Sequence, residues 1–212
     1  MYWNTITPLL AEVLHGAMAN AIFDPFRLVG GTSLSLQIGH RMSDDIDLFS
    51  DASYDSLDFG PINTYFQSTY PIVSTNQVGA IGFGTSYFVG HQEENQVKVD
   101  LYYTDPFIEP INEEEGIRLC SLEDIIGMKL DLTTRTVRKK DFWDLHALHD
   151  LYSIPNMIEL YLKRYPYHDS KEVVLVALSK AAAADGDPDP ICLLGKQWEL
   201  IKLDFANWLD TE

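Results

Sequence analysis

Residues 26–49 constrain the fold most, because two short strand patterns enclose a glycine pair and a short helix pattern. Phe26 to Val29 is apolar and ends at Gly30-Gly31, residues 32–38 have the composition of a short helix, and Ile46 to Phe49 predicts a second strand. Thr32 or Ser33 is the expected start of the helix. This succession of strand, tight turn, helix and strand is typical of an α/β fold.

Further elements follow from the hydrophobic period. Apolar residues recur at helical spacing over residues 9–17, and another helix is expected within residues 54–68. Strands are expected at about 70–78, 81–89 and 96–103.

The second half of the chain has a different pattern. From about residue 121 it is helical, and the loop at 184–190, which contains Pro and Gly, interrupts the helices. We therefore predict an α/β domain over residues 1–118 and a helical domain over residues 119–212.

The glycine turn predicts a phosphate site. Gly30 and Gly31 allow a ligand to approach the backbone closely. The helix that follows would aim free backbone N–H groups and its positive dipole end at an anion. The hydroxyls of Thr32 and Ser33 could add hydrogen-bond donors.

Asp45 and Asp47 alternate with Ile46 and Leu48 on the second strand. Alternate residues of a strand share a face, so both carboxylates point to one side while the apolar pair faces the core. Such a pair can hold Mg²⁺ or Mn²⁺, or bridge two ions about 4 Å apart, as nucleotidyl transfer needs. A solvated turn and the Asp-x-Asp of some glycosyltransferases are competing interpretations, but the preceding strand, turn and helix favour a functional site over a chance pair.

Asp100 is the candidate third carboxylate. In residues 97–103 the apolar side chains take one face of a strand, and Lys98, Asp100 and Tyr102 take the other. If this strand lies beside the strand of Asp45 and Asp47, Asp100 completes a metal triad or acts as base toward an attacking hydroxyl. A solvent-facing Asp is the alternative.

Two later helices carry polar residues on apolar faces. Lys129 falls near the middle of the apolar arc of a helix over residues 121–134, where it must snorkel or meet an NTP phosphate or a carboxylate. Asp141 and Asp144 lie at the start of the next apolar face. Asp141 could be a helix N-cap, and both acids could pair with Lys129 or Arg135.

Charge limits the partners. The chain has 15 Lys and Arg against 32 Asp and Glu, a formal net charge of −17, which argues against broad nucleic-acid binding. A basic patch at 129–140, which includes Arg135, suits a small anion or one end of a polynucleotide. Arg41, beside His40, is a further candidate for contact with phosphate or RNA.

The compartment is indicated by cysteine use and by the N-terminus. Cys120 and Cys192 form no spaced pair typical of disulfides or zinc sites, so reduced thiols are expected. The N-terminus lacks the basic and apolar regions of a signal peptide, and no run approaches the roughly 18 apolar residues of a membrane span. We expect a cytoplasmic protein with no membrane partner.

Three stretches resemble the AbiEii/AbiGii-type nucleotidyltransferase toxins, which are similar to the polymerase-beta-like nucleotidyltransferase superfamily. They are GGTSLSLQIGHRMSDDIDLF at 30–49, VKVDLYY at 97–103 and EDIIGMKLDLTTRTVRKKDFWDL at 123–145. The resemblance implies a nucleotidyltransferase fold, a mixed sheet flanked by helices, followed by a C-terminal helical domain. It also implies the toxin of a toxin–antitoxin or phage-defence module, with a cognate antitoxin as partner.

The same resemblance implies roles in the first two stretches. Gly31 and Thr32 match residues that hold nucleotide phosphates. Asp45 and Asp47 match the metal-binding pair, and Asp100 stands where a third strand carboxylate is expected.

For the third stretch, the resemblance implies that Lys129 contacts phosphate and that Asp141 or Asp144 is the acid tied to activity. The implied reaction moves a nucleoside monophosphate from an NTP to an acceptor hydroxyl on tRNA, on another RNA end or on a protein. Two alternatives stay open. One is a non-catalytic nucleotide- or partner-binding protein on the same fold, and the other is a metal-dependent transferase acting on sugar nucleotides.

Overall fold

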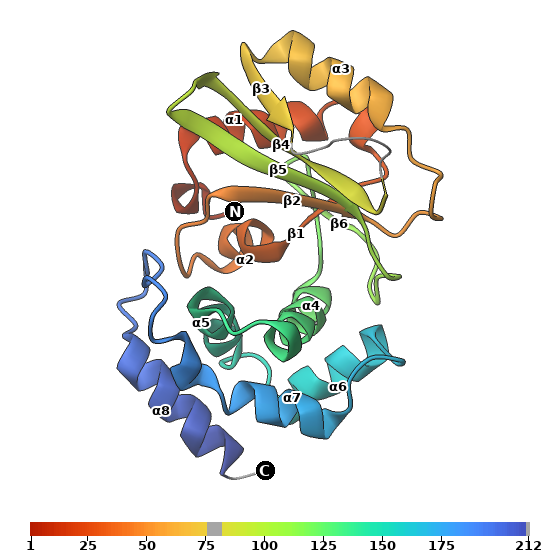
Figure 1. Cartoon of the computed structure of the whole chain (residues 1–212). Helices are drawn as coiled ribbons and strands as arrows, with labels where there is room; N and C mark the ends of the chain where they lie inside the picture. The colour runs from red at the N-terminus through yellow and green to blue at the C-terminus, as the bar shows by residue number, and fades with distance from the viewer. Residues whose placement is uncertain (76–81, 211–212) are drawn as a thin grey trace.

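The computed structural model describes residues 1–75 and 82–210. Within them, seven strands form one mixed sheet in the order β3-β4-β5-β2-β1-β7-β6 (Figure 1). In chain order the strands are β1 (Arg27–Val29), β2 (Asp45–Ser50), β3 (Ile72–Thr75), β4 (Gly84–Gln92), β5 (Asn95–Tyr103), β6 (Asn112–Glu114) and β7 (Ile117–Leu119).

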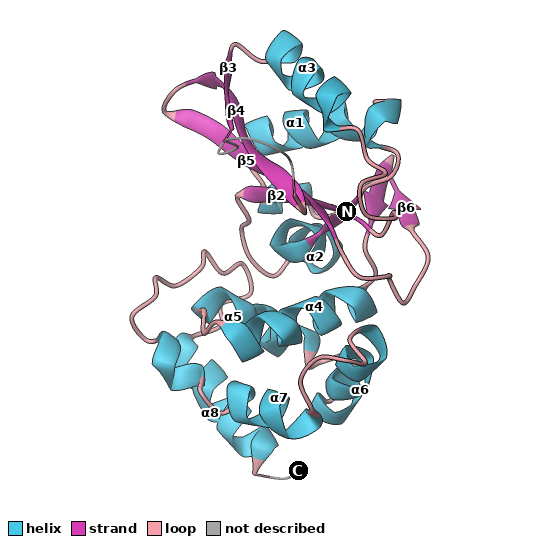
Figure 2. Cartoon of the chain, turned by 45° about the vertical axis from the view of Figure 1, so that its right-hand side comes forward, coloured by secondary structure: helices cyan, strands magenta, loops and turns pink. Residues whose placement is uncertain are grey.

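Helices flank the sheet and make up the second half of the chain. They are α1 (Pro8–Met18), α2 (Gly30–Ile38), α3 (Phe59–Thr69), α4 (Leu122–Arg135), α5 (Lys139–Leu148), α6 (Ile154–Arg164), α7 (Lys171–Leu178) and α8 (Trp198–Leu209). Helices α1 and α3 cover one face of the sheet, while α2 lies on the other face, between the sheet and the helices α4 to α8 (Figure 2). The α/β class and the C-terminal helical part predicted from the sequence are confirmed.

Strand β2 sorts its residues by face, as its alternation predicts. Ile46 and Leu48 are fully buried in the core beneath α1 and α3, while Asp45 and Asp47 point toward α2 and the helical half. Strand β2 pairs in parallel with β5 and antiparallel with β1. The acidic face of β2 is therefore held at the centre of the sheet, where it meets the helical half.

Each half of the chain is stabilised by its own hydrophobic core. The first lies under α1 and α3, and the second lies among α4 to α8 and also takes in Val29 and Leu34 from the sheet half. A buried ion pair between Arg164 and Asp124 ties α6 to the N-terminus of α4, whose N-cap is Ser121. The domain boundary at residues 118 and 119 remains a prediction.

Several expected boundaries are wrong in detail. Helix α2 begins at Gly30 rather than at Thr32 or Ser33, with Val29 in the N-cap position. The helix expected at 54–68 begins only after Asp58, whose carboxylate accepts a hydrogen bond from the N–H of Gly60.

The strand predictions match in part. The strands expected at 70–78 and 81–89 correspond to β3 and β4, and their residues 76–78 and 81 lie outside the described part of the chain. The β6–β7 hairpin was not predicted, because all of β6 is exposed and polar and its turn depends on positive φ angles at Glu115 and Gly116.

The described helices include none that is both long and apolar enough to cross a membrane.

Candidate active site

Strand register brings the three predicted carboxylates together. In the parallel pairing of β2 with β5, Asp47 stands opposite Asp100 and Asp45 stands opposite Lys98. All four side chains line a cleft of about 410 Å³ between the sheet and the helical half. The expectation that the strand of Asp100 lies beside that of Asp45 and Asp47 is confirmed.

The carboxylates of Asp47 and Asp100 are crowded and poorly neutralised. Burial, and then the neighbouring charges of Asp100 and Asp45, raise the pKa of Asp47 to about 6. Lys98 donates to Oδ2 of Asp100 at 2.6 Å, whereas Oδ1 of Asp100 is buried without a hydrogen-bond partner. Such an unpaired buried oxygen among like charges favours a cation in the cleft.

The glycine turn fits closely around these side chains. Gly30 has a φ of +68°, and a Cβ atom there would collide with Oδ2 of Asp47. At Gly31 a Cβ atom would lie 2.5 Å from Nη2 of Arg41. Both glycines line the cleft, so the turn lets Asp47 and Arg41 lie directly against the backbone.

Thr32 and Ser33 lie behind this turn, outside the lining of the cleft. The hydroxyl of Thr32 contacts the backbone carbonyl of Asp45 and Oγ of Ser43, and Ser33 Oγ accepts from the amide of Gln37 at 3.1 Å. In this structure both hydroxyls are engaged inside the protein. Thr32 thereby fixes the start of β2, and with it the position of Asp45.

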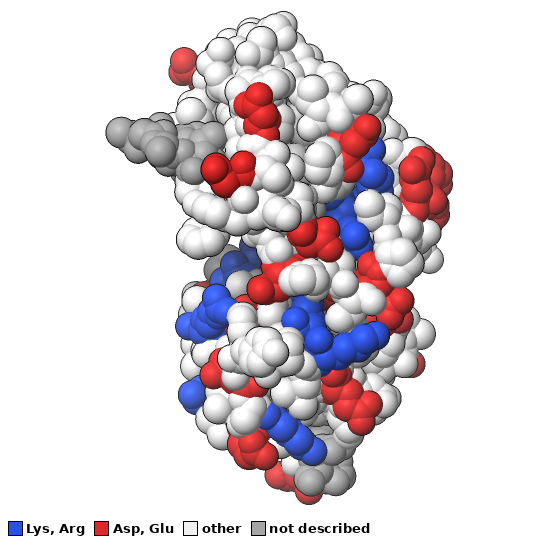
Figure 3. Space-filling model, turned by 90° about the vertical axis from the view of Figure 1, so that its right-hand side faces the viewer, with Lys and Arg blue, Asp and Glu red and all other residues white. Residues whose placement is uncertain are grey.

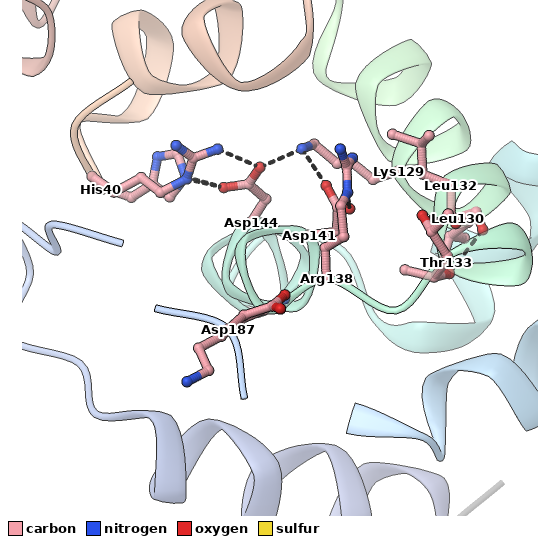
Figure 4. Close-up of polar contacts among 12 residues, drawn as sticks. His40, Lys129, Leu130, Leu132, Thr133, Arg138, Asp141, Asp144 and Asp187 are labelled. Carbon is pink, nitrogen blue, oxygen red and sulfur yellow. Dashed lines mark hydrogen bonds and ion pairs between the residues drawn. The ribbon is translucent and has the colours of Figure 1, made fainter. Parts of the chain in front are cut away.

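A second acidic cluster lies where α5 meets the segment between α2 and β2 (Figure 4). Asp144 Oδ1 is 2.7 Å from Nε2 of His40 and accepts from Nε of Arg41 at 2.6 Å, while Oδ2 accepts from Nη2 of Arg41 at 2.8 Å. Lys129 Nζ lies 2.6 Å from the same Oδ2. Asp144 is thus fully buried, and its partners come from both halves of the chain.

Asp141 extends this cluster toward the cleft. It accepts from Lys129 Nζ at 2.7 Å and from Arg138 Nε at 2.7 Å. The N-cap of α5 is Arg138, so the interpretation of Asp141 as a helix cap is wrong. Because its partners are cations, Asp141 is an ion-pair residue instead.

Electrostatics within this cluster are strongly coupled. Burial alone would raise the pKa of Asp144, but the charges of Arg41 and Lys129 hold that pKa well below its usual range. Burial would likewise lower the pKa of Lys129, but Asp144 and Asp141 raise it. Burial lowers the pKa of His40, against the opposing effect of the neighbouring Asp144 carboxylate.

The second cluster therefore keeps a positive surplus. The cations Arg41, Lys129 and Arg138 face the carboxylates of Asp141 and Asp144. One positive charge is left over, and all three cations line the cleft. An anionic ligand beside them would be stabilised.

Arg135 is not part of either cluster. Its Nη2 donates to Oδ1 of Asp131 at 2.9 Å, rather than to Asp141 or Asp144. His168 Nδ1 lies 3.0 Å from the same oxygen. Arg135, Asp131 and His168 all line the cleft at the α4 wall, together with Tyr165.

Sequence reasoning named Arg135 on this α4 wall but missed the other residues. Asp131 lies on the side of its helix opposite the apolar arc, and His168 and Tyr165 lie far from any motif. Lys98 did carry a signal, because it shares a strand face with Asp100.

The donor set fits a divalent cation that is completed by substrate. The described residues contain no group of three or more His, Cys, Asp or Glu side chains arranged to hold a metal ion by themselves. Mg²⁺ usually takes one or two carboxylates together with substrate phosphates and water. Asp45 and Asp47, with the unpaired Oδ1 of Asp100, match that smaller requirement.

Comparison with known proteins gives a family and a fold. The family model described as "Nucleotidyl transferase AbiEii toxin, Type IV TA system" matches residues 12–207. The uncharacterized protein aq_aa25 of Aquifex aeolicus (strain VF5) is 28% identical over 148 residues. That match covers 65% of this chain and 64% of the relative, so the chain spans just under two thirds of it.

Two solved structures share the architecture. JHP933 from Helicobacter pylori has a TM-score of 0.57 and 18% identity, over 94% of this chain and 89% of that one. MenT4, a nucleotidyltransferase toxin from Mycobacterium tuberculosis, has a TM-score of 0.57 and 14% identity, over 96% of this chain and 84% of that one. The predicted nucleotidyltransferase fold is thereby confirmed.

Proposed function

Because the chain belongs to the AbiEii nucleotidyl transferase toxin family, we propose that it moves a nucleoside monophosphate from an NTP to an acceptor hydroxyl in the cleft. The observation that carries this proposal is the register of β2 with β5, which places Asp47 opposite Asp100 and leaves Asp45 one step away on the same face. Three carboxylates beside a turn of two glycines suit the transfer of a phosphoryl-linked group.

The reaction requires one bond to form and one to break. The acceptor oxygen attacks the α-phosphorus of the NTP, and the bond from that phosphorus to the bridging oxygen breaks, so pyrophosphate leaves. The hydroxyl proton needs a base within hydrogen-bond reach. Asp100 is suited to this role because its Oδ1 is unpaired while Lys98 holds its Oδ2 in place.

Asp45 and Asp47 are the residues that would hold Mg²⁺ or Mn²⁺. Such an ion, when bound, neutralises charge on the triphosphate and polarises the phosphoryl oxygens. The raised pKa of Asp47 supports the assignment, since a bound cation would offset both the burial and the repulsion from Asp100 and Asp45 that raise it.

The phosphates of the NTP would lie between the glycine turn and the three cations of the second cluster, Arg41, Lys129 and Arg138. At the turn, Gly30 and Gly31 leave room for the side chains of Asp47 and Arg41, which would face the phosphates. Arg41 and Lys129 line the same space, although each already pairs with Asp144. We therefore assign them to the net positive field around the phosphates, and Arg135 to the outer wall of the cleft.

The family description places such a protein in a toxin–antitoxin system. We infer a toxin role, in a toxin–antitoxin or phage-defence module, with a cognate antitoxin as genetic partner. The acceptor hydroxyl would belong to tRNA, to another RNA end or to a protein.

The direct experiment incubates the protein with Mg²⁺, α-³²P-labelled NTPs and total bacterial RNA, and follows the label. We expect label in a macromolecule, lost with a chelator and lost at least about a hundredfold in Asp45→Asn, because a bound ion supplies several kcal/mol. Asp55→Asn removes an exposed carboxylate outside the cleft and is the matched control.

The remaining outcomes separate the alternatives. Nucleotide binding with no transfer under any metal would mean a binding protein on the same fold. Label from a sugar nucleotide appearing in a glycan would mean a glycosyltransferase. Either result would overturn the proposal.

A further inference from the structure

The cleft-facing side of strand β2 changes character along its length. Asp45, Asp47 and Phe49 take the same face, where successive side chains are about 7 Å apart. The two acids belong to the charged part of the cleft, whereas Phe49 lines the cleft beyond them and packs against the core of the helical half. The cleft therefore passes from a charged part to an apolar part, as a nucleotide passes from its phosphates to its base.

Side chains from several elements extend this apolar part. Arg164 at the end of α6 donates from Nη2 to Oγ1 of Thr104, the residue after β5, at 3.1 Å. This contact holds the end of α6 against the same end of the sheet. The apolar and aromatic side chains that line the cleft beside Phe49 are those of Tyr103, Ile125, Met128, Leu132 and Tyr165.

A carboxylate with one open oxygen lies at the edge of the apolar part. Oδ1 of Asp131 accepts from Nη2 of Arg135 at 2.9 Å and lies 3.0 Å from Nδ1 of His168. The His168 ring stacks on Tyr165, with centroids 4.7 Å apart. Oδ2 of Asp131 forms no hydrogen bond or ion pair within residues 1–75 and 82–210. Because Asp131 lines the cleft, this oxygen is available to a ligand.

The charges at this end of the cleft are mixed. Figure 3, in which the side of α6 faces the viewer, shows basic and acidic side chains close together at the waist between the two halves. In the lining of the cleft, Arg135 pairs with Asp131, and Asp105 adds an exposed carboxylate. A phosphate here would meet two carboxylates and one cation, whereas the edge of a neutral base needs only local donors and acceptors.

We propose that this part of the cleft binds the base of the NTP, and that Oδ2 of Asp131 accepts a hydrogen bond from an exocyclic amino group of that base. The inference rests on the proposed nucleotidyl transfer and adds what selects the nucleotide. Adenine, guanine and cytosine carry such an amino group, and uracil does not. Asp131 is thus a specificity-determining residue, while Arg135 and His168 are positioning residues that hold its other oxygen.

The selection has a simple physical basis. An amino group that donates to a carboxylate makes a charge-assisted hydrogen bond, which is stronger than one between neutral groups. A carbonyl in the same place would set two acceptors against each other and would leave Oδ2 unpaired away from water.

The test compares nucleotides that differ by one amino group. Dissociation constants are measured by isothermal titration calorimetry with Mg²⁺ and without acceptor, for CTP against UTP, ATP against ITP, and GTP against ITP. The second member of each pair lacks the amino group, and both members carry the same net charge. Their ratio of affinities therefore separates the contact at the base from contacts at the phosphates.

For the wild type we expect CTP, ATP or GTP to bind most tightly, and about tenfold or more tightly than its partner. Tightest binding of UTP or ITP, or equal binding within the preferred pair, would overturn the proposal. This comparison needs no variant.

Asp131→Asn sharpens the test, because its amide oxygen can keep both contacts of Oδ1 while its NH₂ group puts a donor in place of Oδ2. The preference for the amino group should disappear, and it should reverse where the partner has a carbonyl at that position, as UTP has relative to CTP. Asp55→Asn, at an exposed carboxylate outside the cleft, should keep the wild-type ratio. An unchanged ratio in Asp131→Asn that is folded by urea denaturation would overturn the role of Asp131.

Failure of this inference and failure of the proposed function give different results. Equal affinities within the pairs, with label still transferred to an acceptor, would overturn the base contact alone. A preserved preference for the amino group, with no transfer to any acceptor, would support the base contact and overturn nucleotidyl transfer.

Discussion

Two acidic clusters lie on either side of the same cleft. The carboxylates of one are poorly neutralised, and those of the other are fully paired with cations. On the sheet, Asp47 stands opposite Asp100, and Oδ1 of Asp100 is buried without a hydrogen-bond partner. The pKa of Asp47 is raised to about 6. On α5, both oxygens of Asp144 are bound by cations, and its pKa is held well below the usual range.

The difference separates two uses of a buried carboxylate. A cluster that keeps its repulsion is costly to the fold and is suited to receive a cation or a proton. A saturated cluster instead fixes geometry, because each of its ions would be unpaired without the others. We therefore assign Asp47 and Asp100 to the chemistry, and Asp144 to holding Arg41 and Lys129 in place between the two halves.

The largest expected effect on stability comes from the second cluster, in which cations surround Asp144. Asp144→Ala should lower the free energy of unfolding by about 3 to 5 kcal/mol, because Arg41 and Lys129 would remain buried with too little negative charge. Urea denaturation measures this. The control Asp204→Ala removes a carboxylate that is 43% exposed and pairs with His146, and should cost less than about 1 kcal/mol.

If Asp144→Ala lowered the free energy of unfolding no more than Asp204→Ala does, the structural role assigned to Asp144 would be contradicted. It would mean that water or local movement replaces Asp144, and that the cluster does not join the halves.

The sheet cluster should respond in the opposite direction. Asp47→Asn should raise the free energy of unfolding by about 2 to 3 kcal/mol above pH 6 in the absence of divalent metal, since each unit of pKa shift is worth about 1.4 kcal/mol. The pKa of Asp47 is higher in the folded state than its ordinary value of 3.8. Wild-type stability should thus fall as pH rises from about 4 to about 6 and then level off.

Denaturation of both proteins between pH 4 and pH 8 checks this sign. The variant should lack that fall, so the two curves should separate as pH rises. A variant less stable than the wild type at pH 8 would contradict the assignment of unrelieved repulsion to Asp47.

The smallest effect concerns the glycine turn. Gly30→Ala and Gly116→Ala both place a side chain at positive φ, +68° and +78°, which costs about 1 to 2 kcal/mol. Gly116 has open space around it, whereas a Cβ at Gly30 meets Asp47. Gly30→Ala should therefore lose more stability than Gly116→Ala in a thermal melt, and only Gly30→Ala should also lose transfer activity. Equal activity in the two would show that the position of Asp47 is less restricted than the turn suggests.

The sequence predicts the sheet cluster because its signals are local. Asp45 and Asp47 are two residues apart, and a period of two decides which face each side chain takes. The pairing with Asp100 needed only one further assumption, that the two strands are neighbours, and the register satisfies it.

The saturated cluster was only partly predictable. The contact of Lys129 with Asp141 and Asp144 was among the expected alternatives, since all three lie on adjacent helices. The contact of Arg41 with Asp144 joins residues 103 positions apart, and no period along the chain encodes it. For the same reason the hydrogen bond from the backbone N–H of Met42 to the carbonyl of Ile191 is visible only after folding.

The transfer rate of Asp47→Asn tests the central assignment most directly. The measurement is a single-turnover assay with saturating NTP, Mg²⁺ and the acceptor identified by the labelling experiment. We predict a folded variant, more stable than the wild type above pH 6 when divalent metal is absent, whose transfer rate in this assay falls at least about a hundredfold. A folded variant that transfers at the wild-type rate would contradict the account, because the chemistry would then not depend on the carboxylate at the centre of the sheet.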